Sequence, residues 1–527
     1  MAWPNPFRRK DENTRHAWGY TFQWTPEHLT KEQMDPLKMS FDELGSRCIE
    51  RLDKISPPAT GELPRNQSRV PQNEKAEPKP KRDLYELLRD SAAEDEDLGK
   101  LWEEVNTVPS WVDWEQIERG QEVFYRYGGA ILTGIKLAYQ SLLGGMGAAR
   151  VTEVLGRTGG FSAKVSRRSI FQPYGRVLFS LQVFSVQAFS VQAFSVQASS
   201  IQVARRRMYE TTQHILQVTQ SLESIRPGGA GHISSIKVRL LHAAVRNRIT
   251  NLATANPSYY SIPDHGIPIN DLDSIATIGT FSATLIWLAL PRQGIFLRAH
   301  EIADYLALWR LVAHYLGTPT TYFATPSLAK STMESLLLTE INPSPTSRIL
   351  ASNILTSLAH QPPMYSSLPF LHANAYWLNG SELSLALGIP QPPLYYRALV
   401  AAQCLFFVMV CYSNRAVGKW DRRKNQVLRK AFYSVIVDER GTMGGLKGET
   451  DFEMQYVPVA GRTSTELGVV EGVQGRDRWR GVEGRNLKVL LGAGVGFVVL
   501  GSWVGWMGFG RMLGVVGWVA GKVGGQG

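Results

Sequence analysis

Cysteine is scarce in this chain, and its scarcity excludes several classes of protein. The 527 residues include only three cysteines, Cys48, Cys404 and Cys411, and no CxxC pair. So few cysteines fit neither a disulfide scaffold nor a structural zinc site, and we expect a reducing compartment. Cys404 and Cys411 lie seven residues apart in an apolar run. A free cysteine in such a run usually packs as a small hydrophobic side chain.

The motifs of common enzyme classes are also missing. The sequence has no HExxH, GxSxG or P-loop motif, and its Gly-rich stretches do not follow a predicted strand. Hydrolase, kinase and nicotinamide-dehydrogenase functions therefore have no support. The net charge of +11 comes from basic residues spread along the chain, without an aromatic-interleaved patch. We therefore expect no nucleic-acid partner. The N-terminal stretch lacks an apolar segment, so no secretory signal is predicted.

What is present divides the chain into an arm and a core. Residues 1–105 are polar, and we expect a disordered N-terminal arm with a Pro-rich linker at 56–82. Short amphipathic helices are expected on either side of this linker, at 41–55 and 83–105. Residues 106–435 repeat apolar side chains at helical spacing and show no series of period-two strands. This pattern predicts one all-α domain.

Several helices of the core are predicted by their spacing and end signals. Asn270 followed by Asp273 is typical of a helix N-cap, and Gly317 indicates a C-terminal stop. Two uncharged runs, Ser274–Pro291 and Ala398–Asn414, are at the short limit for a membrane span. We expect them to be buried helices of the core. The clearest predicted helices are Arg205–Leu222, Ser234–Thr250, Asp271–Leu290 and Ala299–Leu316.

A low-complexity block interrupts this helical pattern. Residues 178–202 consist of five tandem pentads of the type AFSVQ, and a period of five fits neither a helix nor a strand. Removing residues 169–204 joins two helical patterns into one. We therefore predict an insert here that forms a poorly packed loop.

The C-terminal part of the core is followed by a linker at 436–486 and an apolar segment. Val489–Gly510 runs for 22 residues without a charge, which is long enough to cross a bilayer as a helix. GxxxG spacings within it favour close helix packing in lipid. Basic residues precede it, so the positive-inside rule predicts a cytosolic main domain and a single transmembrane helix at 487–510. The alternative is a Gly-rich disordered tail.

One predicted helix carries a histidine between two arginines. In VRLLHAAVRNRI, His242 follows Arg239 by three residues and precedes Arg246 by four, which places all three on one helix face. An imidazole in an apolar stripe beside two cations suits a planar, anionic, metal-centred ligand such as haem. The histidine would ligate iron and the arginines would offset the propionate charge. The alternative is a core histidine with two solvated arginines.

A second pair lies just after the insert. Arg207 and Thr211 are four residues apart, so on a helix their side chains reach the same ligand edge. The arginine pairs with carboxylates, and the threonine donates one hydrogen bond. The alternative is a surface arginine with a threonine packed against the preceding turn.

Six short motifs occur in one order between about Val108 and Gly317. They are VPSWVDWEQIERGQEVFYRYG, VTEVLGRTGGFS, RMYETTQHILQV, IKVRLLHAAVR, HGIPINDLDSIATIGTF and DYLALWRLVAHYLG. This series resembles the latex-clearing-protein or rubber oxygenase family, whose fungal branch includes ER-bound oxygenases that cleave isoprenoid side chains. Weaker similarity continues to about Tyr433. The resemblance excludes the pentads, the arm and the tail.

The resemblance implies a globin-like, all-α fold that holds one b-type haem. The matching histidine, His242, is then the proximal iron ligand, and the matching pair near the haem is Arg207 and Thr211. A glutamate upstream, which acts as a base in the family, corresponds to Glu153. One departure concerns Glu210, which stands where latex-clearing members have a basic residue.

The function implied by the resemblance is an oxidoreductase at a membrane. It would use haem and dioxygen to cleave a carbon–carbon double bond of an apolar, isoprenoid-type substrate, and the branch implies the endoplasmic reticulum. One alternative is a non-catalytic, membrane-anchored protein of the same fold that binds haem or a lipid. Another is a tethered helical scaffold without a cofactor.

Overall fold

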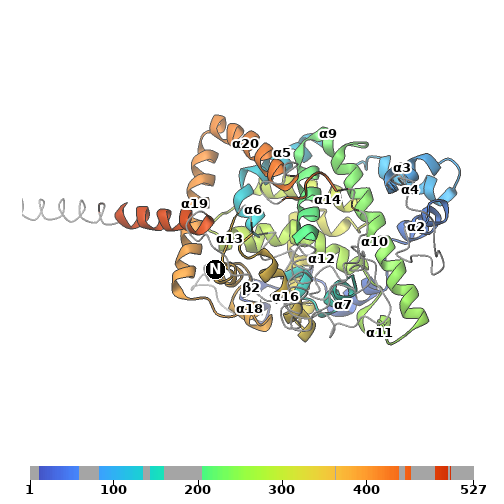
Figure 1. Ribbon diagram of the computed structural model, residues 1–527, viewed down its shortest axis with the longest axis horizontal. Helices are drawn as coiled ribbons and strands as arrows, with labels where there is room; N and C mark the ends of the chain where they lie inside the picture. The colour runs from blue at the N-terminus through green and yellow to red at the C-terminus, as the bar shows by residue number, and fades with distance from the viewer. Residues whose placement is uncertain are drawn as a thin grey trace, which may run out of the picture.

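The computed structural model shows a body built almost entirely of helices (Figure 1). The all-α fold class predicted from the helical periodicity is therefore confirmed. The structure describes residues 11–58, 82–134, 143–158, 205–361, 364–437, 445–450, 452, 481–496 and 499. The predicted insert at 169–204, and most of the predicted linkers at 56–82 and 436–486, lie outside these residues.

The N-terminal arm is folded where it is described, so the predicted disorder is wrong for residues 11–58 and 82–105. Two short strands pair as an antiparallel hairpin, with Thr14 opposite Gln23. The predicted helices at 41–55 and 83–105 are present, the second divided in two. The elements are β1 (Thr14–Ala17), β2 (Tyr20–Gln23), α1 (Lys31–Met34), η1 (Asp35–Lys38), α2 (Glu43–Ile55), α3 (Leu84–Ser91) and α4 (Glu96–Asn106).

The arm folds because each of its pieces buries an apolar face against the core. Phe22 and Met34 join the main hydrophobic core. Ile49, Leu88 and Leu101 instead form a second cluster with one side of α10 (Ala230–Ala255). Burial of each such side chain contributes about 1.5–3 kcal/mol. The arm is polar in composition because its solvent-facing sides are polar. Composition alone therefore did not predict these apolar contacts.

The core is centred on α5 (Trp114–Arg126) and α14 (Ala299–Tyr315), which pack closely. A Cβ added at Gly120 would lie 2.4 Å from the carbonyl oxygen of Asp304, so glycine is required for this approach. Arg119 donates two hydrogen bonds to the Asp304 carboxylate across the same contact. Helix α14 ends at Tyr315, just before Gly317, whose φ of +67° stops the helix as the sequence predicts.

The predicted helix Asp271–Leu290 is broken in two. Asn270 caps α12 (Asp271–Phe281) by accepting a hydrogen bond from the Asp273 backbone at 2.9 Å, which confirms the predicted N-cap. At Ser282 the backbone leaves the helical conformation, and the chain continues as a π turn, η4 (Leu285–Ala289). Both pieces are buried, as expected for the core.

The other uncharged run, Ala398–Asn414, lies in α19 (Leu394–Ala416), which is buried on one side only. Among the described residues it is the one unbroken helix long and apolar enough to cross a membrane, and α12 with η4 passes the same test as a bent pair. The prediction of a buried core helix therefore holds for one side of α19 and is wrong for the other.

The remaining elements complete the body and are labelled in part in Figure 1. A further helix covers 205–220, and another begins at 482 and continues through 496. The predicted transmembrane segment at 487–510 is described only in this first part. The others are α6 (Gly128–Gly134), α7 (Ala149–Thr158), α9 (Leu222–Ile225), α11 (Ile262–His265), α13 (Leu290–Arg292), η5 (Thr321–Phe323), α15 (Pro326–Thr339), α16 (Pro345–Leu358), α17 (Leu368–Asn379), α18 (Ser381–Ala386) and α20 (Gly418–Val437).

Candidate functional site

An open cavity lies beside the middle of α10, between α7, the helix at 205–220, α12 and α14. Its volume is about 300 Å³, and the hollow measures about 1720 Å³ when its open mouth is counted. Small-molecule pockets hold roughly 300–1,000 Å³ and are lined mainly by apolar side chains. The apolar part of this wall includes Val154, Met208, Leu241, Val245, Ile278 and Phe281.

His242 stands on the cavity wall. Burial, together with the charges of Arg246 and Arg207, lowers the pKa of His242 to about 4, so the imidazole is neutral at pH 7. Among the described residues, its ring has no hydrogen-bond partner within the protein. A neutral imidazole with a free ring nitrogen is the usual form of a histidine metal ligand.

The two arginines beside His242 are not in the cavity. Arg239 donates to the Asp42 carboxylate at 2.7 and 2.8 Å and to Glu104 at 2.8 Å. Arg246 donates to the Ser46 hydroxyl at 2.7 Å and to backbone carbonyls of the arm and of the loop before α12. Both guanidiniums therefore hold the N-terminal arm, and these contacts do not suit the propionate role predicted for them.

Helical geometry explains why one face serves two purposes. At about 100° per residue, Arg239 and Arg246 lie some 40–60° to one side of His242, and Val238 and Val245 lie as far to the other. The cavity is on the valine side. The sequence places the three side chains on one face, but that face is wide enough to serve both the cavity and the arm.

Arg207 and Thr211 line the same cavity as His242. The Thr211 hydroxyl donates to the backbone carbonyl of Arg207 at 3.2 Å, and its oxygen remains an acceptor. Glu210 also lines the cavity, and its carboxylate accepts hydrogen bonds from Arg206 at 3.0 Å and Thr450 at 3.4 Å. The structure thus brings a cation, a hydroxyl and a carboxylate to the wall near His242.

Glu153 is not brought to the cavity. Its neighbours Val151 and Val154 line the wall, but the Glu153 carboxylate accepts from Arg157 at 2.7 Å and from Thr346 at 3.2 Å.

Two further ionisable residues line the cavity that the sequence pattern did not single out as site residues. His214 follows Thr211 by three residues on the same helix. Its Nδ1 lies 3.0 Å from the Ser234 hydroxyl, and its buried Nε2 has no partner among the described residues. Burial, with the charge of His242, lowers the pKa of His214 to about 3. The helical spacing from Thr211 was the signal that could have identified it.

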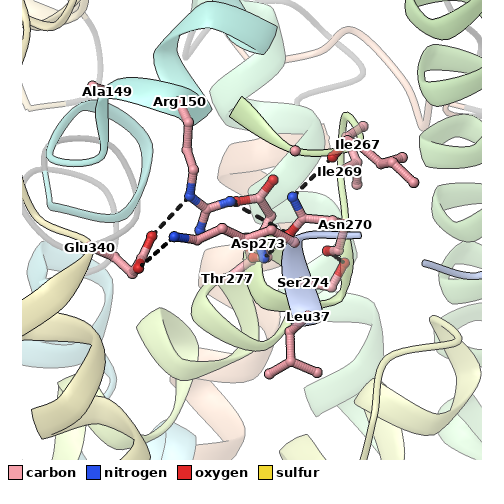
Figure 2. A network of polar contacts seen from close by, with 12 residues as sticks. Leu37, Ala149, Arg150, Ile267, Ile269, Asn270, Asp273, Ser274, Thr277 and Glu340 are labelled. Atoms are coloured by element: carbon pink, nitrogen blue, oxygen red, sulfur yellow. Dashed lines mark hydrogen bonds and ion pairs between the residues drawn. The ribbon is translucent and has the colours of Figure 1, made fainter. Parts of the chain in front are cut away.

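Asp273 is the other residue that was missed. Its carboxylate lines the cavity and binds the Arg150 guanidinium, which also donates to Glu340 at 3.0 Å (Figure 2). Lys38 approaches Glu340 at 3.2 Å from the arm. Burial raises the pKa of Asp273 above its usual value, although Arg150 opposes this shift. From the sequence, Asp273 was assigned only to the N-cap of a helix, so its position at the cavity was missed.

Comparison with known proteins shows which oxygenase family a part of this chain is similar to. Residues 165–407 match the family model described as "ER-bound oxygenase mpaB/B'/Rubber oxygenase, catalytic domain". The matched residues make up less than half of the chain and are similar to that catalytic domain, in agreement with the family that the sequence motifs resemble. The match does not separate the ER-bound branch from the others.

Two relatives are similar to this chain. The rubber oxygenase of Streptomyces sp. (strain K30) is 24% identical over 183 residues, which are 34% of this chain and 44% of that protein. The chain thus matches less than half of that relative's length. A solved structure of a latex clearing protein in the closed state has 17% sequence identity and a TM-score of 0.47, and the alignment covers 79% of this chain and 92% of that one.

Proposed function

We propose that this protein is a haem-dependent oxygenase that cleaves a carbon–carbon double bond of an apolar, isoprenoid-type substrate. The observation that supports this most is His242, a neutral imidazole without a protein partner among the described residues, on the wall of an open cavity. The family match adds the oxygenase class, and the name of one relative gives rubber as that protein's substrate.

The residues of the cavity fit a haem of the b type. His242 would hold the iron through one ring nitrogen, and Arg207 is the cation on the same wall that would offset propionate charge in place of Arg239 and Arg246. When bound, the haem iron would supply the activation of dioxygen. The chain itself supplies an apolar lining that excludes water and suits an alkene chain.

A proton acceptor is also needed to remove an allylic proton from such a substrate. Glu153 has this role by resemblance, but its carboxylate is held by Arg157 away from the wall. Asp273 lines the cavity, and Arg150 binds its Oδ1. We therefore propose the Asp273 carboxylate as the acceptor, because burial makes it more basic than usual even though Arg150 and a hydrogen bond from the Asn270 backbone oppose this shift.

A spectrum of the purified protein tests the cofactor assignment. We expect His242→Ala to abolish the Soret band, because the iron then loses its ligand. His314→Ala is a matched control, since His314 is a partly buried histidine on α14 that does not line the cavity. A normal band in His242→Ala, with a folded protein by circular dichroism, would exclude this ligand.

A non-catalytic protein that binds haem or a lipid is the second candidate. It is favoured by the position of Glu153 and by Glu210, which stands where latex-clearing members have a basic residue. Oxygen consumption with a polyisoprene oligomer separates the two functions. An Asp273→Asn variant that keeps the Soret band and loses turnover would favour the oxygenase. Equal turnover in Asp273→Asn would exclude Asp273 as the acceptor.

We further propose that the protein is anchored in a membrane by its C-terminal helix, with the main domain in the cytosol and the endoplasmic reticulum as the compartment. The described start of this helix, at 482–496, leaves the body and exposes Leu491 and Val495 (Figure 1). An apolar substrate would partition into the same bilayer.

A further inference from the structure

Helix α19 carries an uncharged stripe on its exposed side. Residues three or four apart share one face of a helix, and this stripe keeps that spacing for about 22 Å at 1.5 Å per residue. We define the α19 stripe as Leu394, Ala398, Ala401, Leu405 and Met409. Its three large side chains are exposed by 80%, 38% and 48%, in chain order. The opposite side of α19 is buried against α17 and α6.

The C-terminal helix is fixed to α19 where it begins. The Asn486 side-chain amide donates to Gln403 of α19 at 3.4 Å, and the Arg485 guanidinium lies 4.6 Å from the ring centroid of Phe406. Glu483 accepts a hydrogen bond from the Ser367 backbone at 2.6 Å. After this docked turn, the helix crosses the α19 edge of the body and projects away from it (Figure 1).

More apolar and basic groups surround this exit. Met364 and Tyr365 are exposed, and the Met364 carbonyl accepts from the Val482 backbone at 3.1 Å. Tyr395, in the first turn of α19, and Trp420, in the first turn of α20, are exposed aromatic residues of the kind found at membrane interfaces. No acidic residue occurs between Leu394 and Trp420. Exposed basic residues lie near the stripe in the chain: Arg397 on α19, and Lys419, Arg422 and Arg423 at the start of α20.

We propose that the α19 stripe is a lipid-binding surface that lies in the interfacial layer of an anionic bilayer. This inference rests on the proposed membrane anchor and specifies how the body sits on the membrane. Because the anchor helix projects from the α19 edge, a bilayer that it enters meets the stripe. Apolar helix faces flanked by basic residues bind such interfaces by apolar burial and by attraction to anionic lipids.

An environment-sensitive fluorophore on the full-length protein tests this surface. The probe is attached at Met409→Cys, and a matched control carries it at Met39→Cys, a methionine of similar exposure (55%) in the arm. All three native cysteines are buried, and burial raises the pKa of Cys48 and Cys404 to about 12, so their thiols react slowly. The protein is reconstituted in phosphatidylcholine vesicles with and without phosphatidylserine.

We expect a blue-shifted emission at position 409, and its quenching by nitroxide lipids, only when vesicles are present. Both effects should be larger with phosphatidylserine, and position 39 should show neither. If the protein floats with the vesicles but the emission of the 409 probe stays as it is in water, the proposed α19 surface is wrong and the membrane anchor is retained. A protein that does not float overturns both. A blue shift without vesicles shows that a second copy covers the stripe instead.

A pair of substitutions provides an independent measurement. Leu405→Glu with Met409→Glu should lower the fraction of protein retained on anionic vesicles after a high-salt wash. Leu338→Glu with Met39→Glu is the control, because Leu338 on α15 is exposed to the same 38% as Leu405. Equal retention of the two double variants would contradict the proposal. The Soret band should be normal in both, so a failure here is distinct from a failure of the haem site.

Discussion

At the scale of single residues, Arg239 was predicted to contact a haem propionate but instead binds the N-terminal arm. Its guanidinium is almost fully buried and binds two carboxylates of the arm, Asp42 and Glu104. Burial alone would raise the pKa of Asp42, but the hydrogen bonds and charge of Arg239 outweigh it and lower this pKa. The pair therefore joins the arm to α10, the helix that carries His242.

Removal of Arg239 should destabilise the protein. Leaving one partner of a buried ion pair uncompensated costs about 3–5 kcal/mol, so Arg239→Met should lower the free energy of unfolding by about that much. Urea denaturation measures the change. Arg47→Met on α2 is the control, because its half-exposed pair with Asp97 is screened by solvent and contributes little to stability.

The pH dependence provides a second readout of the same pair. A carboxylate with a lowered pKa in the folded state stabilises above its unfolded value of about 3.9, and this contribution is lost as the pH falls through the folded pKa. Asp42→Asn should therefore flatten the acid side of the stability curve. An unchanged slope would contradict the assigned role of the pair.

At the scale of elements, sequence periodicity predicted most helices, and packing set their breaks. The signals at Asn270 and Gly317 are local hydrogen-bonding and backbone preferences, so they were readable in the sequence. The break at Ser282 was not, because the apolar run continues through it. Similarly, the α19 run was read as buried, since composition does not show which side of a helix meets the body.

Gly317 provides a test of how α14 ends against α10. A Cβ at this position would lie 2.6 Å from Nε of Arg239, and the φ of +67° already disfavours other residues by about 1–2 kcal/mol. Gly228→Ala is the matched control, with a φ of +83° and open space around the new Cβ. We expect Gly317→Ala to lower the thermal midpoint more than Gly228→Ala. Equal shifts of the thermal midpoint would show that the backbone strain of a positive φ accounts for both effects, without a contribution from the contact with Arg239.

At the scale of the whole molecule, the arm is part of the folded body. Besides Arg239 and Arg246, Lys237 binds Asp83 at 2.6 Å, and the His232 ring lies 2.8 Å from the backbone carbonyl of Val105. One side of α10 is thus covered by the arm, and another faces the cavity. The arm and the candidate site are therefore linked through one helix.

A cut chain tests this integration. Cleavage at a protease site introduced between residues 58 and 82 should leave the two pieces associated, because their apolar and ionic contacts do not depend on the connecting segment. Size-exclusion chromatography of the cleaved protein measures this. Separation of the pieces at neutral pH without denaturant would show that the arm is only tethered.

The sequence by itself determined the helical class, the resemblance to the rubber oxygenase family and the choice of His242 as a candidate ligand, because helical spacing and short motifs are local properties. It also placed Arg207 and Thr211 together, since four residues span one helical turn. Only the tertiary structure decided which groups share the cavity, replacing Glu153 by Asp273 and turning Arg239 and Arg246 toward the arm. The physical reason is that a charged side chain pairs with whatever partner the fold brings within a few ångströms, and that partner comes from a distant part of the chain.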